Sequence, residues 1–95
     1  MAVKYEINSV SMNEAEYNSF VEKMREIWCS NLGVDSIADD DNYFVLGGNS
    51  LRGIKLLSEI NAVSGVEIDY NDIFEFQEFL PLTEKIYEAV IAGKR

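Results

Sequence analysis

Apolar side chains recur at gaps of three and four residues along the first third of the chain, and this spacing constrains the fold more than any other feature. The residues that follow it are Tyr17, Phe20, Val21, Met24, Ile27, Trp28 and Leu32. Positions spaced in this way share one face of an α-helix, and that face must pack against another element. Ser11 and Glu14 have the spacing of a capping box, and Gly33 suits a helix C-terminus. We therefore expect a helix over residues 12–32.

A second helix is predicted to begin near Ser50 and to end before Gly65. Its apolar face consists of Leu56, Leu57, Ile60 and Val63. Leu51 and Ile54 are also apolar, but their helical phase turns them away from that face. We therefore expect these two side chains on the exposed side of the helix.

The C-terminal third predicts a short helical turn and one longer helix. Asp69 can cap the turn, which should run through Ile73 and Phe74. The longer helix has apolar residues in register at Leu82, Ile86, Ala89 and Val90. Pro81 belongs in its first turn, where a missing N–H is tolerated, and Gly93 should follow its end. The predicted fold class is all-α: a small antiparallel bundle of three to four helices with a long first loop.

The connection at residues 34–49 is long for a small domain. A loop of this length is usually functional or held by its own apolar residues, and we expect Phe44 and Leu46 to anchor it. Residues 1–10 alternate partly between apolar and polar side chains but are too few to build a sheet. We therefore expect an extended leader there, followed by one domain over residues 11–93.

The residue counts exclude several kinds of chemistry. The chain has no histidine and one cysteine, which excludes Ser-His-Asp and Cys-His catalysis and argues against a zinc site. The formal net charge is −9, and an acidic surface repels nucleic acids and anionic lipids. The single cysteine fits a reducing, cytoplasmic setting, and no apolar stretch is long enough to cross a membrane. We expect no catalytic residue, no bound metal, no nucleic acid and no membrane partner.

The acidic run at residues 39–41 raises a calcium site as an alternative. A calcium-binding loop needs oxygen ligands at positions 1, 3 and 5, Gly at position 6 and Glu at position 12. Counted from Asp39, positions 5, 6 and 12 are Tyr43, Phe44 and Ser50. The pattern fails, so we interpret the run as a solvated acidic loop.

The segment at residues 41–51 carries the most specific motif in the chain. Its core, Leu46-Gly47-Gly48-Asn49-Ser50-Leu51, resembles the carrier-site signature of peptidyl carrier (thiolation) domains. Further matches lie at Ile27-Trp28, Leu32-Gly33, the aspartate-then-aromatic run at 41–44, Leu56, Ile60 and Ile73-Phe74-Glu75. The resemblance covers about residues 14–92 and implies an acyl carrier protein-like helical bundle.

In that family the motif serine is esterified by 4′-phosphopantetheine from coenzyme A, through a separate transferase and magnesium. The matching residue here is Ser50. A serine that opens a helix lies beside unpaired N–H groups, which favour a phosphate. Gly47 and Gly48 permit a tight turn and the approach of a transferase. The resemblance thus implies a cofactor-binding group of Gly47, Gly48, Asn49 and Ser50, although Asp or His is common at the place of Asn49.

The resemblance also implies a docking surface. Family members contact partners through the positions just after the serine, which are Leu51, Arg52, Ile54 and Lys55 here. Exposed apolar residues beside a functional site are typical of such a patch, and the alternative is that Leu51 and Ile54 lie partly buried under the loop. The implied partners are a phosphopantetheinyl transferase, an adenylating enzyme and downstream condensing or tailoring enzymes. We expect the carrier itself to be a monomer.

We interpret the chain as a free-standing or excised peptidyl carrier domain, acted on by enzymes in nonribosomal peptide or related biosynthesis. Two alternatives stay open: an acyl carrier for polyketide or fatty acyl groups, and an unmodified helical interaction module. The simpler interpretation of Ser50 is a helix-capping serine after a glycine turn. Gln77 and Glu78 stand where the family often has a Pro-Thr pair, so the entry to the last helix stays open as well.

Overall fold

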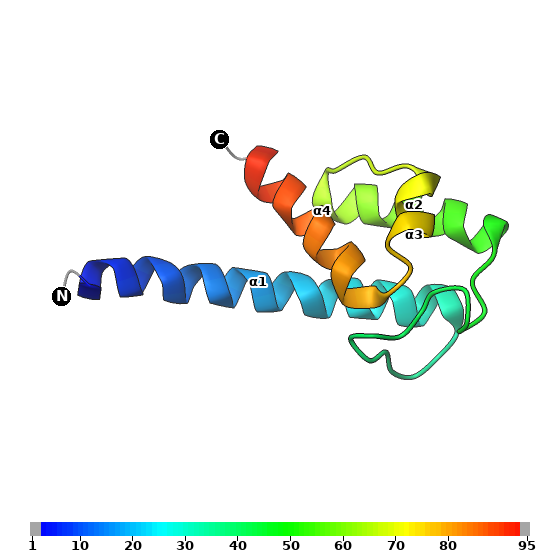
Figure 1. Cartoon of the computed structure of the whole chain (residues 1–95), viewed down its shortest axis with the longest axis horizontal. Coiled ribbons are helices and arrows are strands. Elements are labelled where there is room, and N and C mark those ends of the chain that lie inside the picture. Colours follow the sequence, from blue (N-terminus) through cyan, green and yellow to red (C-terminus); the bar gives the residue numbers. More distant parts are fainter. Residues whose placement is uncertain (1–2, 94–95) are drawn as a thin grey trace.

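The computed structural model describes the backbone of residues 3–93 and the side-chain surroundings of residues 14–93. Within these residues the helices are α1 (Val3–Leu32), α2 (Ser50–Ser64), α3 (Tyr70–Glu75) and α4 (Phe79–Gly93). Figure 1 shows α2 running back along α1, α4 crossing obliquely, and the short α3 beside α2. Residues 34–49 connect α1 to α2 without a helix. The predicted all-α bundle with a long first loop is confirmed.

One apolar core joins the helices and the loop. Its buried side chains are Val21, Met24, Trp28, Leu32, Ile37, Tyr43, Leu56, Ile60, Ile73, Phe79, Leu82 and Ile86. Trp28 packs edge-to-face against Tyr43 and Phe79, with ring centroids 5.2 and 5.1 Å apart. Such aromatic pairs contribute roughly 0.5–1.5 kcal/mol beyond the apolar area that they bury. The predicted apolar faces of α1, α2 and α4 supply most of this core, although Val63 and Ala89 are exposed.

The start of α1 differs from the prediction. The extended leader expected over residues 1–10 is helix from Val3 onward, and residues 1 and 2 lie outside the described residues. The Ser11–Glu14 pattern is therefore inside the helix and not at its start. No Gly or Pro interrupts the segment, and each residue added to an existing helix gains a backbone hydrogen bond without a new nucleation cost. Figure 1 shows this part of α1 projecting beyond the other helices of a molecule that measures 49 × 26 × 20 Å.

Most predicted helix ends are confirmed. Gly33 and Gly65 follow α1 and α2 with φ angles of 71° and 74°, in the left-handed region that glycine adopts readily. Asp69 caps α3, because its side chain accepts from the Asp72 amide while the Asp72 side chain accepts from the Asp69 amide. Gly93 is the last residue of α4 and does not lie beyond its end.

The entry to α4 is held by the long loop. The Phe79 amide donates to the Asp41 carbonyl and the Leu80 amide donates to the Asp39 carbonyl, both at 2.9 Å. The amides that open a helix have no partner within it, so these bonds satisfy two of them. Pro81 lies in the first turn, as predicted. Backbone carbonyls of the loop thus accept the first amides of α4, after Gln77 and Glu78.

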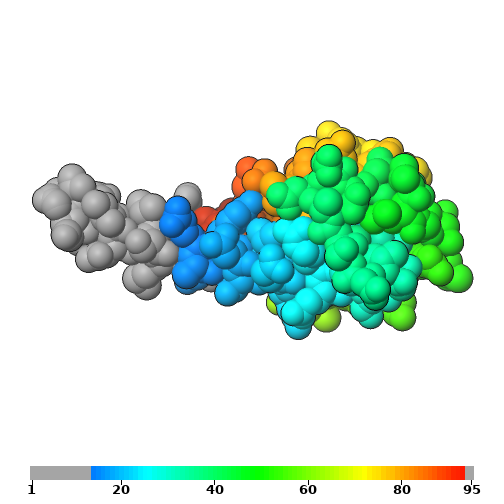
Figure 2. All heavy atoms as spheres, turned by 90° about the horizontal axis from the view of Figure 1, so that it is seen from below, coloured from blue at the N-terminus to red at the C-terminus, as the bar shows by residue number. Residues whose placement is uncertain are grey.

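The loop is anchored most deeply by residues other than those predicted. Phe44 and Leu46 are half-buried against the core, whereas Ile37 and Tyr43 are 5% and 0% exposed. Tyr43 combines a large apolar ring with a hydroxyl that can find a partner when buried, which suits a loop crossing a core. Figure 2 shows the loop, in teal and green, lying beside the C-terminal part of α1.

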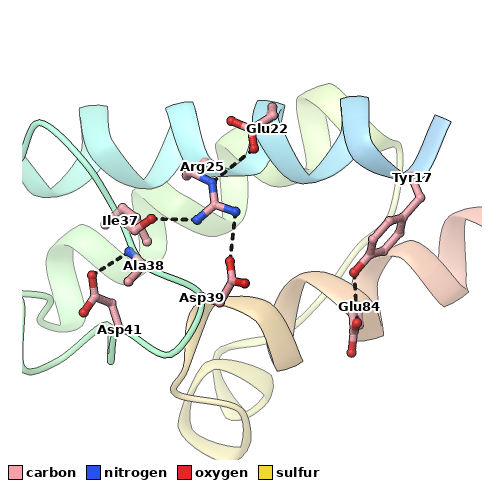
Figure 3. A network of polar contacts seen from close by, with 8 residues as sticks. All are labelled: Tyr17, Glu22, Arg25, Ile37, Ala38, Asp39, Asp41 and Glu84. Atoms are coloured by element: carbon pink, nitrogen blue, oxygen red, sulfur yellow. Dashed lines mark hydrogen bonds and ion pairs between the residues drawn. The ribbon is translucent and has the colours of Figure 1, made fainter. Parts of the chain in front are cut away.

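The acidic run also holds the loop in place. The Arg25 guanidinium on α1 donates to the Ile37 carbonyl at 2.6 Å and to Asp39 Oδ1 at 2.9 Å (Figure 3). Asp41 Oδ2 accepts from the Ala38 amide at 2.7 Å. Residues 39 and 40 are exposed, which agrees with the interpretation of a solvated acidic loop, but the carboxylates of Asp39 and Asp41 also accept hydrogen bonds. They stabilise the loop because α1 and the loop backbone supply donors beside them.

Candidate functional site

Ser50 is the first residue of α2, and its side chain is exposed. The helix is capped by the residue before it, because Asn49 Oδ1 accepts a hydrogen bond from the Arg52 amide at 2.9 Å. Asn49 has the extended backbone of an N-cap, with φ −153° and ψ −177°. The simpler interpretation of Ser50 as the capping residue is therefore wrong. The Ser50 hydroxyl is therefore not used in capping and can contact or react with other groups.

The turn that precedes α2 begins at Asn42. Its side-chain Oδ1 accepts from the amides of Phe44 and Val45 at 2.8 and 3.1 Å. This side chain imitates a backbone turn, which is a common use of Asn. The turn closes where the Gly48 amide donates to the Tyr43 carbonyl at 2.9 Å. Local polar contacts thus set the path by which the chain enters α2.

Gly48 has no room for a side chain. A Cβ atom there would overlap the ring of Tyr43. The Tyr43 hydroxyl donates to Asn31 Oδ1 at 2.7 Å, and Asn31 Nδ2 donates to the Arg52 carbonyl at 2.9 Å. Burial raises the pKa of Tyr43 to about 12, so the hydroxyl remains a donor near neutral pH. These contacts fasten the glycine turn to α1 and to the first turn of α2.

The glycine turn is also held by a contact between Gly47 and Arg52. Gly47 has a φ of 114°, which side-chain-bearing residues rarely adopt. Its carbonyl accepts from Arg52 Nη1 at 3.2 Å. Sequence reasoning assigned Arg52 to docking alone, but its guanidinium also holds the turn beside Ser50.

The predicted docking residues lie on the exposed side of α2. Leu51 and Ile54 are 79% and 61% exposed, so the alternative that they lie under the loop is wrong. Arg52 and Lys55 are exposed beside them. Phe74 and Val45 are further exposed apolar residues, at 49% and 81%. The docking role itself stays a prediction.

Sequence reasoning missed Tyr70, the first residue of α3. Its hydroxyl donates to Ser50 Oγ at 3.3 Å. Its ring lies over Gly53, where a Cβ atom would come within 2.5 Å of Tyr70 Cε1. A glycine inside a helix costs roughly 1 kcal/mol relative to alanine. Gly53 was therefore the signal that another side chain packs closely on α2, although no local pattern identifies which one.

The described residues also bear on two other kinds of site. No group of three or more His, Cys, Asp or Glu side chains among them is placed to hold a metal ion. None of the helices in that part of the chain combines the length and apolar character needed to cross a membrane.

Comparison with known proteins gives matches in both sequence and structure. Residues 22–79 match the family model described as a phosphopantetheine attachment site. The chain is 41% identical over 58 residues to gramicidin S synthase 2 of Brevibacillus brevis, in an alignment that covers 61% of this chain and 1% of the synthase. The chain thus spans only a small part of the curated relatives that it matches.

Two solved structures share the fold. One is BlmI, a type-II acyl carrier protein of Streptomyces verticillus involved in bleomycin biosynthesis, with a TM-score of 0.77 at 20% identity over 84% of this chain and 96% of that chain. The other comes from the structure of the phosphopantetheine transferase Sfp with coenzyme A and a peptidyl carrier protein. It has a TM-score of 0.69 at 26% identity over 72% of this chain and 88% of that chain.

Proposed function

The chain belongs to the family of domains with a phosphopantetheine attachment site, and from this premise we propose that Ser50 is the residue to which the cofactor is joined. As a member of this family the chain is a carrier with an attachment site for covalently bound 4′-phosphopantetheine. We further propose that its cargo is an aminoacyl or peptidyl thioester of nonribosomal peptide synthesis, as the name of its relative gramicidin S synthase 2 supports.

The geometry at the start of α2 supports Ser50 as the attachment residue. Its hydroxyl is exposed, and Asn49 caps the helix in its place. Within residues 14–93, the amides of Ser50 and Leu51 have no acceptor. Free amides and the positive end of a helix favour an anion, so this donor set fits a phosphodiester. The observation that carries the proposal is that Asn49 caps the helix while the Ser50 hydroxyl stays exposed.

The proposed modification needs no base from this chain, which contains no histidine. Ser50 Oγ forms a bond to the phosphorus that bears the pantetheine of coenzyme A. The diphosphate bond of coenzyme A breaks, adenosine 3′,5′-bisphosphate leaves, and the hydroxyl proton passes to a base of the transferase. The attached group supplies a terminal thiol that holds acyl or aminoacyl groups as thioesters. In this proposal the chain presents the hydroxyl and performs no catalysis.

The exposed side of α2 supports a docking role for Leu51 and Ile54, with Arg52 and Lys55 beside them. The proposed partners are a phosphopantetheinyl transferase, an adenylating enzyme and downstream condensing or tailoring enzymes. Each must bind and leave in turn, which favours small interfaces. We also propose that the carrier is cytoplasmic and that it is a monomer.

Intact mass after incubation with coenzyme A, magnesium and a broad-specificity transferase tests the attachment site. The parent should gain one phosphopantetheine, and the Ser50→Ala variant should gain none. Ser58→Ala, which changes another exposed serine of α2, serves as the matched control and should be modified like the parent. Modification of Ser50→Ala, or none in a folded parent, would contradict the proposal.

The same preparation separates the two kinds of cargo. Loading of the modified protein by adenylating enzymes, and not by acyltransferases, would support the peptidyl role. The reverse result would favour the alternative, a carrier for polyketide or fatty acyl groups. An unmodified interaction module is the account that remains if the parent gains no mass.

A further inference from the structure

The starts of two helices meet beside Ser50. Ser50 opens α2 and Tyr70 opens α3, and the Tyr70 hydroxyl donates to Ser50 Oγ at 3.3 Å. The two residues are 20 positions apart in the chain, so the contact is made by the fold and not by a local turn. Because Asn49 caps α2, the Ser50 hydroxyl takes no part in capping and can accept this hydrogen bond from Tyr70.

The Tyr70 ring is held in position from two sides. It lies over Gly53, one turn after Ser50, and it packs edge-to-face against Phe74 with ring centroids 4.8 Å apart. The Asp69 cap fixes the backbone from which the ring projects. A hydroxyl presented by a fixed ring loses little conformational freedom when it binds, which makes its hydrogen bond more effective. This close approach explains why the residue one turn into α2 is a glycine.

The Tyr70 hydroxyl would form a stronger hydrogen bond with a charged acceptor than it does with the neutral Ser50 hydroxyl. An O–H···O bond is usually 2.5–3.0 Å long, so 3.3 Å to a neutral hydroxyl is long. Hydrogen bonds to charged phosphate oxygens are shorter and about twice as strong as those between neutral groups. Arg52 and Lys55 are the basic residues of this end of α2, and the Arg52 guanidinium is engaged by the Gly47 carbonyl.

We infer that Tyr70 is a positioning residue for the group carried on Ser50. Its hydroxyl orients the Ser50 side chain before modification and donates to a non-bridging phosphate oxygen of the phosphodiester afterwards. This inference rests on the proposed attachment at Ser50. By this inference α3, as well as α2, determines the direction in which the phosphopantetheine arm leaves the protein.

Tyr70→Phe tests the inference, because it removes the hydroxyl and keeps the ring on Gly53. The phosphorus-31 NMR resonance of the modified protein should shift relative to the parent. The rate of modification, as kcat/KM of the transferase, should fall by about three- to tenfold, mainly in kcat, since the hydroxyl orients the reacting group and is not a docking contact. Melting temperatures, measured alongside, should stay close to the parent.

Tyr17→Phe is the matched control. It also removes one tyrosine hydroxyl that donates to a side chain, in this case Glu84 at 2.9 Å between α1 and α4. It should change neither the phosphorus resonance nor the rate. A second variant, Gly53→Ala, displaces the Tyr70 ring without removing its hydroxyl and should shift the resonance and slow the transfer as well.

The possible outcomes distinguish a failure of the role of Tyr70 from a failure of the proposed attachment at Ser50. If the parent is modified on Ser50 but Tyr70→Phe has the parent's resonance and rate, the role of Tyr70 is refuted while the attachment site stands. If the parent is not modified at all, the attachment proposal fails first. A shifted resonance in Tyr70→Phe with an unchanged one in Tyr17→Phe supports the inference.

Discussion

The surroundings of Ser50 and the seam between α1 and α4 are held together in different ways. Around Ser50, the geometry depends on particular atoms: the Asn49 cap, the missing Cβ of Gly48 and the Tyr43 hydroxyl. We call this region the site end and define it as residues 42–53 with Tyr70.

The α1–α4 seam, defined as Tyr17, Phe20 and Tyr87, depends on aromatic packing. Tyr87 contacts Tyr17 and Phe20 with ring centroids 5.3 and 5.2 Å apart. Contacts of this kind depend mostly on apolar area and tolerate substitutions of similar shape. The two regions therefore differ in the contacts that hold them. The contacts of the site end also position the reactive hydroxyl, and those of the seam do not.

Gly48→Ala should break the site end most severely. Its added Cβ overlaps the buried Tyr43 ring, and overpacking of this kind costs roughly 1–3 kcal/mol. The free energy of unfolding from denaturant titration measures the loss, and the rate of phosphopantetheine transfer should fall with it. Gly93→Ala is the control, because a Cβ there meets nothing within 4 Å. Equal stability of the two variants would show that the Tyr43 ring does not exclude a side chain at position 48.

Asn49→Ala should have the next largest effect. Loss of an N-cap side chain costs about 1 kcal/mol, so the denaturation midpoint should fall and α2 should fray at its start. The fraying should appear as faster hydrogen exchange of the Arg52 amide, which donates to Asn49 Oδ1 in the parent. Asn61→Ala, an exposed change in the same helix, should leave stability within a few tenths of a kcal/mol. A stable Asn49→Ala variant would show that the cap is not needed.

Alkaline pH should weaken the site end through Tyr43. Burial raises the pKa of its hydroxyl from 10.0 to about 12 in the folded protein. The unfolded chain therefore loses this proton first, and the stability it contributes is present below pH 10 and lost as the pH rises through about 12. Tyr43→Phe should lose less stability than the parent between pH 8 and pH 11 in denaturant titrations. An identical pH dependence of the two proteins would contradict this.

Tyr17→Phe at neutral pH should have the smallest effect. The variant loses one exposed hydrogen bond to Glu84 but keeps its ring against Tyr87. The expected cost is about 0.5 kcal/mol or less, with no change in the rate of transfer. Calorimetric melting and the mass assay check both parts. A slower transfer in this variant would show that the seam and the site end are coupled.

Local signals in the sequence were enough for most of the fold. Glycines marked the ends of α1 and α2, Asp69 marked the start of α3, and helical spacing identified the buried faces. These signals act over three to five residues, which is the range that a linear pattern can describe. The motif around Ser50 was equally local, and the structure places Ser50 at the exposed start of α2 where the pattern expected it.

The remaining features depend on contacts between distant parts of the chain. The Tyr70 hydroxyl reaches Ser50 across 20 residues, and the Tyr43 hydroxyl reaches Asn31 on another helix. Periodicity could not separate Tyr43 from Phe44 as the deeper anchor, because a loop has no fixed period. The early start of α1 was missed because residues 3–10 contain no Gly or Pro and therefore give no local sign of where the helix begins.

The position of the cap at Asn49 has a thermodynamic consequence. A side chain that caps a helix is linked to folding, so any reaction on it would change the folding equilibrium. Ser50 makes no capping contribution, because the bond that closes the first turn belongs to its neighbour. A group can therefore be placed on Ser50 or taken from it without loss of the hydrogen bond that starts α2. The first turn of the helix keeps its cap in the unmodified and in the modified protein.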